Sequence, residues 1–342
     1  MTSRPRIALD AMGSDLGPPA TVAGAAAASL HDRAPDLLLV GDEAILRAEL
    51  SRHPHAKDRI RIVHASQVCA MDASPRDALE RHPDASILVA ARLVAEDHAD
   101  VLVSAGNTGG VTLACAQSFE RLPGVGRAAL GAVLPTERRR GEKNDPFGLI
   151  LDAGLTLEPT ADDLVAFAVM GSAYSRVISR NPRPKVALLS IGSEPTKGTK
   201  AIVEAHARLT KHTGLDFLGN VEGMDIPRGT ADVVVTGGFV GNIVLKMLEG
   251  VSDTAMRLAK SAKEKRLRYA AGLYLLGPAL HRVREITDWQ QYGGVPILGF
   301  DRLCIKAHGR STARAVTNAI KVATITAQSD VVGSIREGLS AG

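Results

Sequence analysis

Short apolar runs and segments with helical periodicity alternate along this chain. The run at 6–9 predicts a buried strand that ends at Asp10, and the runs at 37–40 and 101–103 have the same aliphatic character. Segments such as 86–98 and 161–179 repeat their apolar residues with a period near 3.6 and predict helices between the strands. This alternation predicts an α/β fold with a mostly parallel sheet flanked by helices.

The remaining segments extend the same pattern. Further strands are expected at 60–63, 128–134, 148–151, 186–189 and within 297–308, and further helices at 108–121 and 311–327. The segment 137–146 is expected to be a charged surface turn, and 217–224 to be irregular. Since no linker composition divides the chain, we expect a single α/β domain at 1–342 with a helical excursion at about 245–295.

The segment 231–250, ADVVVTGGFVGNIVLKMLEG, combines a strand, a glycine turn and a helix. Such a turn exposes backbone N–H groups and the positive end of a helix, which together bind anions. Glycines also serve tight turns that hold no ligand, so the turn alone leaves both readings open. The segment 99–110, ADVLVSAGNTGG, has the same arrangement. The strands in 99–110 and 231–250 therefore both end in turns whose backbone can approach a bound group closely.

Polar side chains stand at the carboxyl ends of six predicted strands. They are Asp10, Ser104, Asp152, Ser190, Thr236 and His308. Open α/β sheets bind ligands at that edge, so we expect one composite site. Lys306 shares a strand face with His308, because alternate residues of a strand point the same way. Other groups that suit phosphate are Asn107, Thr108, Lys197 and Asn242.

Composition narrows the class of protein. Of the 342 residues, 45% are hydrophobic and 23% are charged, as in soluble globular proteins. Aromatic residues make up only 3%, which argues against base-stacking platforms, so no nucleic-acid partner is expected. The formal net charge is +4, and the excess gathers at 138–140 and 257–268. Solvated surface is the simplest explanation of these clusters, and an acidic partner or anionic lipid is the sharper one.

The cysteines and the N-terminus favour a cytoplasmic protein. Cys69, Cys115 and Cys304 lie far apart without zinc spacing, and no other group of side chains has metal-ligand spacing. The first residues show no signal-peptide pattern, and the apolar stretch at 270–280 is shorter than the ~20 residues of a spanning helix. We therefore expect no disulfide, no metal and no membrane span.

Motifs of several enzyme classes are absent. The chain has no Gly-x-Ser-x-Gly elbow, no His-Glu-x-x-His pair and no Gly-x-x-x-x-Gly-Lys-Ser/Thr loop. The segment 124–129, GVGRAA, matches a loose dinucleotide fingerprint but follows a helix and Pro123 rather than a strand. A nicotinamide dehydrogenase is therefore disfavoured, and no cofactor is expected.

A series of short motifs closely resembles the phosphate acyltransferases of bacterial phospholipid synthesis, in the family's order over nearly the whole chain. The motifs are LDAMG at 9–13, VSAGNTG at 103–109, RAAL at 127–130 with LPT at 134–136, IG at 191–192 with KG at 197–198, FLGNVEG at 217–223, GFVGN at 238–242 with LK at 245–246 and EG at 249–250, YGG at 292–294 with LG at 298–299, and IKAHG at 305–309. Five positions depart from the family pattern: Ser14, Thr156, Ser193, Thr199 and Gly237 stand where the family has Gly, Asn, Glu, Asn and Asp.

The resemblance implies transfer of a fatty acyl group from acyl carrier protein to inorganic phosphate, which gives acyl phosphate. It also implies a homodimer with a fold similar to phosphotransacetylases and isocitrate-dehydrogenase-like proteins. Direct attack of bound phosphate on a thioester needs no Ser or Cys nucleophile, and a thiol of pKa about 8.5 leaves readily as thiolate. The protein must orient the two reactants and stabilise the developing oxyanion.

The candidate site follows from this chemistry and the motifs. The catalytic candidates are His308, Lys306 and Asp10, and Asp10 either orients these groups and orders the loop or caps a helix. The candidates for binding phosphate and substrate are Met12, Gly13, Ser104, Gly106, Asn107, Thr108, Asp152, Gly154, Gly192, Lys197, Gly198, Gly238, Phe239 and Asn242.

Two alternative functions remain open at this point: a short-chain phosphotransacetylase that uses coenzyme A, and a non-catalytic relative that binds acyl carrier protein or lipid. A basic cluster followed by the apolar stretch 269–280 predicts contact with the inner membrane surface through 260–280. Burial of the same stretch in a dimer interface is the competing reading.

Overall fold

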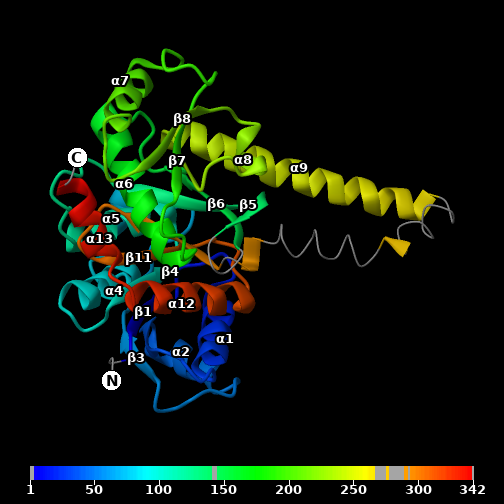
Figure 1. Cartoon of the computed structure of the whole chain (residues 1–342). Helices are drawn as coiled ribbons and strands as arrows, with labels where there is room; N and C mark the ends of the chain where they lie inside the picture. The colour runs from blue at the N-terminus through cyan, green and yellow to red at the C-terminus, as the bar shows by residue number, and fades with distance from the viewer. Residues whose placement is uncertain (1–3, 141–144, 266–274, 277–288, 292, 341–342) are drawn as a thin grey trace.

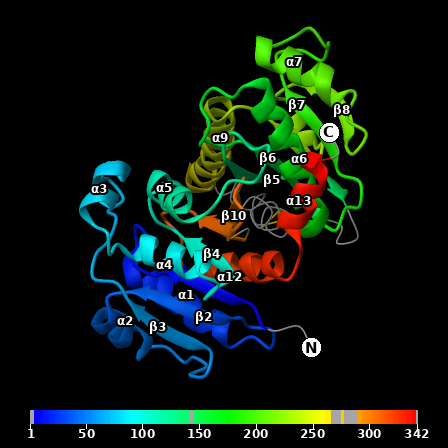
Figure 2. The ribbon, with the colours of Figure 1, turned by 90° about the vertical axis from the view of Figure 1, so that its left-hand side faces the viewer.

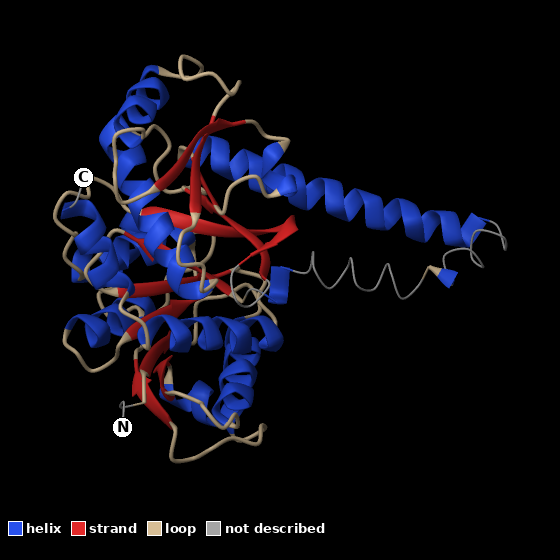
Figure 3. Ribbon diagram, in the orientation of Figure 1, coloured by secondary structure: helices blue, strands red, loops and turns tan. Residues whose placement is uncertain are grey.

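The computed structural model describes residues 4–140, 145–265, 275–276, 289–291 and 293–340 (Figure 1). An eleven-stranded sheet in the order β3-β2-β1-β4-β11-β10-β5-β6-β9-β7-β8 runs through it, with helices on both faces (Figure 3). The strands are β1 (Arg6–Asp10), β2 (Asp36–Gly41), β3 (Ile60–His64), β4 (Val101–Ser104), β5 (Ala129–Arg140), β6 (Asp145–Leu151), β7 (Lys185–Leu189), β8 (Asp216–Val221), β9 (Val233–Val235), β10 (Gly294–Leu298) and β11 (Leu303–Ala307). The helices are α1 (Gly17–Ser29), α2 (Glu43–Leu50), α3 (Pro75–Arg81), α4 (Ser86–Ala95), α5 (Thr108–Ser118), α6 (Ala161–Ile178), α7 (Lys200–Leu209), α8 (Asp225–Arg228), α9 (Gly238–Lys265), the 3₁₀ helix η1 (Trp289–Gln291), α12 (Ala313–Ala327) and α13 (Val331–Ser340).

The predicted α/β class is confirmed, with two local errors. The segment 217–224 was expected to be irregular, but most of it forms β8, where Gly219 has a φ of +97° and the pairing with β7 shifts register. The segment 137–146 was expected to be a surface turn, but its two ends are strand, because β5 continues to Arg140 and pairs with the start of β6 at Asp145; the middle of that segment, 141–144, lies outside the described residues. A bulge after Pro135 breaks the alternation by which a long strand is recognised.

The directions of the strands divide the sheet into two halves. In the first half, β3, β2, β1, β4 and β11 are parallel to one another. Three antiparallel pairings then follow, β11 with β10, β10 with β5, and β5 with β6. Three reversals leave β6 and its parallel neighbours β9, β7 and β8 running opposite to the first half. The carboxyl ends of the two halves therefore lie at opposite edges of the sheet.

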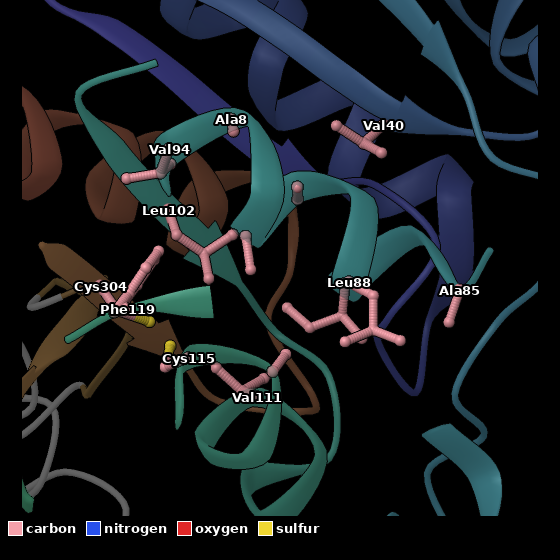
Figure 4. Packing of buried hydrophobic residues seen from close by; sticks show 14 of the residues in the cluster. Ala8, Val40, Ala85, Leu88, Val94, Leu102, Val111, Cys115, Phe119 and Cys304 are labelled. Carbon is pink, nitrogen blue, oxygen red and sulfur yellow. The ribbon is translucent and has the colours of Figure 1, made fainter. Parts of the chain in front are cut away.

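Two apolar layers pack on the first half of the sheet. On one face, alternate residues of β1, β4 and β11 pack with α4 and α5; Leu102, Val111 and Cys304 belong to this layer (Figure 4). On the other face the intervening residues, such as Val103, pack with α1 and α12. Figure 2 shows α4 and α5 on one side of β4 and α12 on the other. Each strand end is therefore held rigidly from both faces.

Helix α9 packs on the sheet only along its first turns. Val244, Leu245 and Leu248 contact the apolar cluster of the second half. Beyond them the helix extends from the body of the protein as a long arm (Figure 1). The predicted helical excursion thus begins in α9, whereas 266–274 and 277–288, which include much of the predicted membrane-contact stretch, lie outside the described residues. Among the described helices, none has the length and apolar character needed to cross a membrane.

Candidate active site

Three polar side chains form one row across adjacent parallel strands. Asp10 ends β1, Ser104 ends β4 and Lys306 lies near the end of β11; Ser104 is the register partner of both others. Since neighbouring strands are about 4.8 Å apart, the outer two backbones in this row lie about 10 Å apart. The residues two positions earlier on these strands all belong to the layer under α4 and α5, so the three side chains project toward that same face.

Asp10 is fully buried and is bound on both carboxylate oxygens. Its Oδ1 accepts hydrogen bonds from Ser86 Oγ at 2.6 Å and from the Gly13 backbone N–H at 3.2 Å, and its Oδ2 accepts one from Ser104 Oγ at 2.7 Å. Gly13 is needed here, since a Cβ on it would lie 2.4 Å from Oδ2. Asp10 is therefore hydrogen-bonded to three segments near the carboxyl end of β4, through Gly13, Ser86 and Ser104.

The turn between β4 and α5 is held by its own side chains. Gly106 N donates to Ser104 Oγ at 3.0 Å. Asn107 caps α5, because its Oδ1 accepts from Gly110 N at 3.1 Å while its Nδ2 donates to Met71 O at 2.8 Å. Both ends of the Asn107 amide are thus engaged in the fold, which leaves the backbone N–H groups of the first turn, at Thr108 and Gly109, as the anion-binding feature of this turn.

Lys306 is a buried cation beside this turn. It is only 7% exposed, and burial lowers the pKa of its ammonium group to about 8, against the smaller opposing effects of Cys304, Asp10 and Asp15. Its Nζ donates to Ala307 O. With this pKa the side chain is mostly protonated at pH 7. The row therefore presents a positive charge close to a helix N-terminus, where an anion is favoured.

His308 follows β11 and is half-buried. Its pKa is lowered, first by burial and then by Lys246, Arg310 and Lys306, while Glu249 raises it. Its Nδ1 accepts a hydrogen bond from Arg310 N at 3.1 Å, so the neutral ring carries its proton on Nε2. Around neutral pH this ring therefore acts as a hydrogen-bond donor through Nε2.

A second carboxylate, Asp152, occupies the equivalent place in the other half of the sheet. It follows β6, and its backbone N–H donates to Thr236 O at the end of the parallel strand β9. The sequence echo between 99–110 and 231–250 thus corresponds to two structural units, each with a carboxylate beside a hydroxyl residue and a glycine turn. Asp152 is fully buried, and its carboxylate accepts backbone N–H bonds from Leu130, Gly154, Leu155 and Thr156.

The glycine turn before α9 is already filled by protein atoms. A Cβ on Gly238 would lie 2.6 Å from Asp152 Oδ2, and Gly238 N donates to Thr156 O at 2.7 Å. Burial raises the pKa of Asp152, and the four backbone donors lower it. Because a carboxylate already stands at this helix end, a second anion would meet like charge there. Gly154 and Asn242 are close to each other, with Asn242 exposed.

The other predicted binding residues fall at separate places. Gly192, Lys197 and Gly198 share the loop after β7, where Ser190 Oγ donates to Lys197 O at 2.9 Å. Met12 packs against Gly41 and the apolar layer beneath it. Phe239 is 59% exposed on the first turn of α9.

The expectation of one composite site at a single edge is therefore wrong for half of its members. Asp10, Ser104 and His308 lie at the edge of the first half; the opposed strand directions put Asp152, Ser190 and Thr236 at the other edge. Helix α9 links the two edges, because it starts beside Asp152 and carries Lys246 and Glu249 next to His308.

Several residues of the first edge were not identified from the sequence. Ser86 binds Asp10 from 76 positions away and shows no local signal. Asp15 donates its backbone N–H to Gly309 O at 2.9 Å and acts electrostatically on Lys306. Lys246 and Glu249 lie in the LK and EG motifs, so those motifs were the available signal. Among the described residues, no group of three or more His, Cys, Asp or Glu side chains is arranged to hold a metal ion.

Comparison with known proteins gives consistent results over nearly the full chain. Residues 5–333 match the family model described as fatty acid synthesis protein. The phosphate acyltransferase of Heliobacterium modesticaldum is 42% identical over 335 residues, which cover 97% of each chain. That of Thermoanaerobacter pseudethanolicus is 37% identical over 332 residues, covering 97% of this chain and 96% of the relative.

Solved structures support the fold. A phosphotransacetylase from Streptococcus pyogenes superposes with a TM-score of 0.63 at 18% identity, covering 95% of this chain and 94% of that one. A 4-hydroxythreonine-4-phosphate dehydrogenase from Klebsiella pneumoniae gives a TM-score of 0.55 at 15% identity, covering 96% and 99%. At such identities the likeness concerns the fold alone.

Proposed function

The chain belongs to the phosphate acyltransferase family of fatty acid synthesis proteins and is an acyltransferase, and from this premise we propose that it transfers a fatty acyl group from acyl carrier protein to inorganic phosphate. A phosphate oxygen attacks the thioester carbonyl, the carbon–sulfur bond breaks, and acyl phosphate and the carrier thiol leave. The observation that carries the proposal is the row Asp10–Ser104–Lys306 beside the N-terminus of α5.

Phosphate is assigned to the first edge of the sheet. The first-turn N–H groups of α5 and the cation of Lys306 supply the positive potential that a dianion needs. Asp10 orders the surrounding turns through Ser86, Ser104 and Gly13, and its own charge is offset by Lys306. The Asp152 turn has no such buried cation among the contacts described for it, which favours the first edge.

His308 is assigned to the thioester. In its neutral form the Nε2–H donates to the carbonyl oxygen as negative charge develops there, or to the departing sulfur. A hydrogen-bond donor of this kind contributes about 2.7–4 kcal/mol to transition-state stabilisation. No covalent intermediate on the enzyme is required, since bound phosphate is itself the nucleophile.

The test is incubation of the purified protein with palmitoyl-acyl carrier protein and phosphate, followed by mass spectrometry of the products. Formation of palmitoyl phosphate and free carrier is expected. Turnover with short-chain coenzyme A thioesters but not with the carrier would favour a short-chain phosphotransacetylase instead. Binding of the carrier without any product from either donor would favour a non-catalytic relative.

A homodimer is proposed on the apolar face of α9. Phe239, Ile243, Met247 and Val251 recur every four residues along one side of the helix and are 49–64% exposed. A contiguous apolar stripe on a long helix is typical of a surface that a second helix covers. Met247→Glu with Val251→Glu should yield a monomer by analytical ultracentrifugation, whereas Ser252→Glu, an exposed control off the stripe, should not.

Contact with the membrane surface remains a proposal about the far end of the arm. Leu275 and Leu276 are 79% and 56% exposed, and the chain before them is basic. Leu275→Glu with Leu276→Glu should abolish flotation with anionic liposomes at low salt. Absence of flotation by the unmutated protein under any condition would remove the membrane from the proposal. The whole chain is proposed to act as one domain, since one sheet contains strands from Arg6 to Ala307.

A further inference from the structure

The segment 69–75, which leads into α3, lies against the first turn of α5. Asn107 Nδ2 donates to the backbone oxygen of Met71 at 2.8 Å. A Cβ on Gly109 would lie 2.7 Å from Pro75 Cγ, so the proline ring packs directly on the backbone of that turn. Helices α3 and α5 are also in contact. The segment 69–75 is therefore one wall of the place assigned to phosphate.

Met71 also reaches the end of β11 with its side chain. A Cβ on Gly309 would lie 2.7 Å from Met71 Cε, so the terminal methyl group contacts the Gly309 backbone. Gly309 directly follows His308, whose Nδ1 accepts a hydrogen bond from Arg310 N at 3.1 Å. The Met71 methyl group and the His308 ring are therefore both held at the dipeptide 309–310. Met71 thus contacts the α5 turn through its carbonyl oxygen and the end of β11 through its side chain.

Met71 differs in kind from the side chains assigned to the reaction. Asp10, Ser104, Lys306 and His308 are all polar or charged. Met71 is partly buried and carries only a thioether, so its side chain contributes volume and apolar contact rather than strong hydrogen bonds. Such a group occupies space at a polar site without offering water a strong partner.

The proposed reaction has a competing nucleophile. Attack of water on the same thioester carbonyl breaks the same carbon–sulfur bond and gives free fatty acid and the carrier thiol. Water can also hydrolyse the acyl phosphate before it leaves the site. Water is present at a far higher concentration than phosphate, so positioning of phosphate must be combined with exclusion of water if acyl phosphate is to be the main product.

We propose that Met71 determines which nucleophile reacts: its apolar side chain, beside His308 and the first turn of α5, keeps water away from the thioester carbonyl, so that bound phosphate attacks instead. The proposal rests on the proposed function, which places the thioester at His308 and phosphate at α5. It adds a specificity-determining residue that the row of polar side chains does not include.

Gly309 supports this assignment. The φ of Gly309 is not positive, so its backbone conformation does not by itself require glycine. Space does require it, because a Cβ there would lie 2.7 Å from Met71 Cε and 2.8 Å from Asp15 Oδ2. A side chain at position 309 would therefore displace the Met71 methyl group from the turn that holds His308.

The test measures the ratio of two products, palmitate and palmitoyl phosphate, formed from palmitoyl-acyl carrier protein at a fixed phosphate concentration. Spontaneous hydrolysis of palmitoyl phosphate in the same buffer is subtracted. Met71→Ser should raise the ratio of palmitate to palmitoyl phosphate by at least about fivefold, because it removes the apolar wall. Met71→Leu, which conserves volume and apolar character, should keep the ratio within about twofold. Met224→Ser is the matched control at a 57% exposed position and should leave the ratio unchanged.

Every substitution at position 71 retains the backbone oxygen that Asn107 binds, so these variants change the side chain alone. In the absence of phosphate, Met71→Ser should hydrolyse palmitoyl-acyl carrier protein at least about fivefold faster than the unmutated protein. A merely structural role would lower both products without changing their ratio. Gly309→Ala reaches the same contact with Met71 still present and should also raise the ratio. In Gly309→Ala with Met71→Ala the two effects should not multiply, because both act through one contact.

An unchanged product ratio in Met71→Ser, or a ratio in Met71→Leu as high as that in Met71→Ser, would overturn the proposal while leaving acyl phosphate formation intact. The proposed function fails separately, if the unmutated protein forms no palmitoyl phosphate. In that case faster phosphate-free hydrolysis by Met71→Ser would still support the wall beside a bound thioester, and unchanged hydrolysis would refute both.

Discussion

Replacement of Lys306 by methionine should stabilise the protein while it removes activity. Lys306 is a cation in an almost fully buried position, and its ammonium group has lost most of its hydration. Methionine has a similar length and no charge, so it fills the same space without that cost. A residue whose removal stabilises the fold is retained for function, and this makes the variant a direct test of the assigned site.

The magnitude follows from the pKa of this group. The lowering from 10.5 to about 8 corresponds, at about 1.4 kcal/mol per pKa unit, to a cost of about 3 kcal/mol for burying the charged form. The variant also loses the hydrogen bond from Nζ to Ala307 O, which is worth about 1 kcal/mol. At pH 7 the variant should therefore be about 2 kcal/mol more stable than the unmutated protein.

The dependence on pH has a definite sign. The folded-state pKa lies below the unfolded value, so the folded protein releases this proton first. Below about pH 8 the full cost is present. Between about pH 8 and 10.5 the unfolded state holds more protons, so the unmutated protein gains stability as the pH rises, and the advantage of the methionine variant shrinks.

Urea unfolding of both proteins at pH 7, 8.5 and 10 measures this difference, and acyl phosphate formation measures the loss of turnover, expected to be about 100-fold. Lys246→Met is the matched control, because Lys246 is 54% exposed and pairs with Glu249 at the surface. Its stability should change by less than about 0.5 kcal/mol. A Lys306→Met protein that is less stable at pH 7 and retains turnover would refute the argument.

Three further outcomes are expected. His308→Ala should lower turnover by at least about tenfold with an unchanged thermal midpoint. Protonation of Nδ1 breaks the bond that it accepts from Arg310 N and releases the ring from its orientation, so turnover of the unmutated protein should fall only below its lowered pKa, which lies under the ordinary His value of about 6.5; equal pH profiles for both proteins would remove His308 from the mechanism. Gly237→Asp, which introduces the family residue, should destabilise the fold by about 1–3 kcal/mol, because its Cβ would lie 2.7 Å from the Pro159 ring, and Pro159→Ala should relieve this loss in the double variant; an unchanged urea midpoint in Gly237→Asp would contradict the clash. Activity should survive EDTA, and loss of activity that one divalent ion restores would show that a metal takes part.

The sequence predicted which segments form strands and that most of them pair in parallel, but not where the strand direction reverses. Aliphatic runs identify buried strands such as β1, β4 and β9, because a strand that is buried on both faces carries apolar side chains at consecutive positions. Direction depends on how many reversals lie between two strands, and β10, β5 and β6 supply three of them. Two of these strands, β5 and β6, include parts of the segment 137–146, which was expected to be a charged surface turn. The edge assignment of Asp152 and Thr236 failed for that reason.

Some candidate site residues could be identified from the sequence and others could not. Lys306 and His308 were identified because a lysine and a histidine at the end of an apolar strand contradict their surroundings. Asn107 and Asp152 were equally plausible ligand-binding residues in the sequence. In the structure, however, their polar side-chain atoms form hydrogen bonds within the loops that they close. Only distances distinguish an amide that binds ligand from one that caps a helix. Ser86 could not be found at all, because its partner is set by the packing of α4 against β1.

The two equivalent turns of this fold explain why one edge is assigned to chemistry and the other is not. Each turn places a buried carboxylate beside a helix N-terminus, and a carboxylate there competes with any incoming anion. At Asp152 the competition stands, since among the described residues its carboxylate is held by backbone donors and by no buried cation. At Asp10 the second strand along, β11, adds the ammonium of Lys306, which offsets the carboxylate and leaves the helix end attractive to phosphate. An anion site beside Asp10 therefore requires the buried charge of Lys306, although burying that charge destabilises the fold. If the charge were removed, the uncompensated carboxylate of Asp10 would repel phosphate from the first turn of α5, as Asp152 does at the second turn.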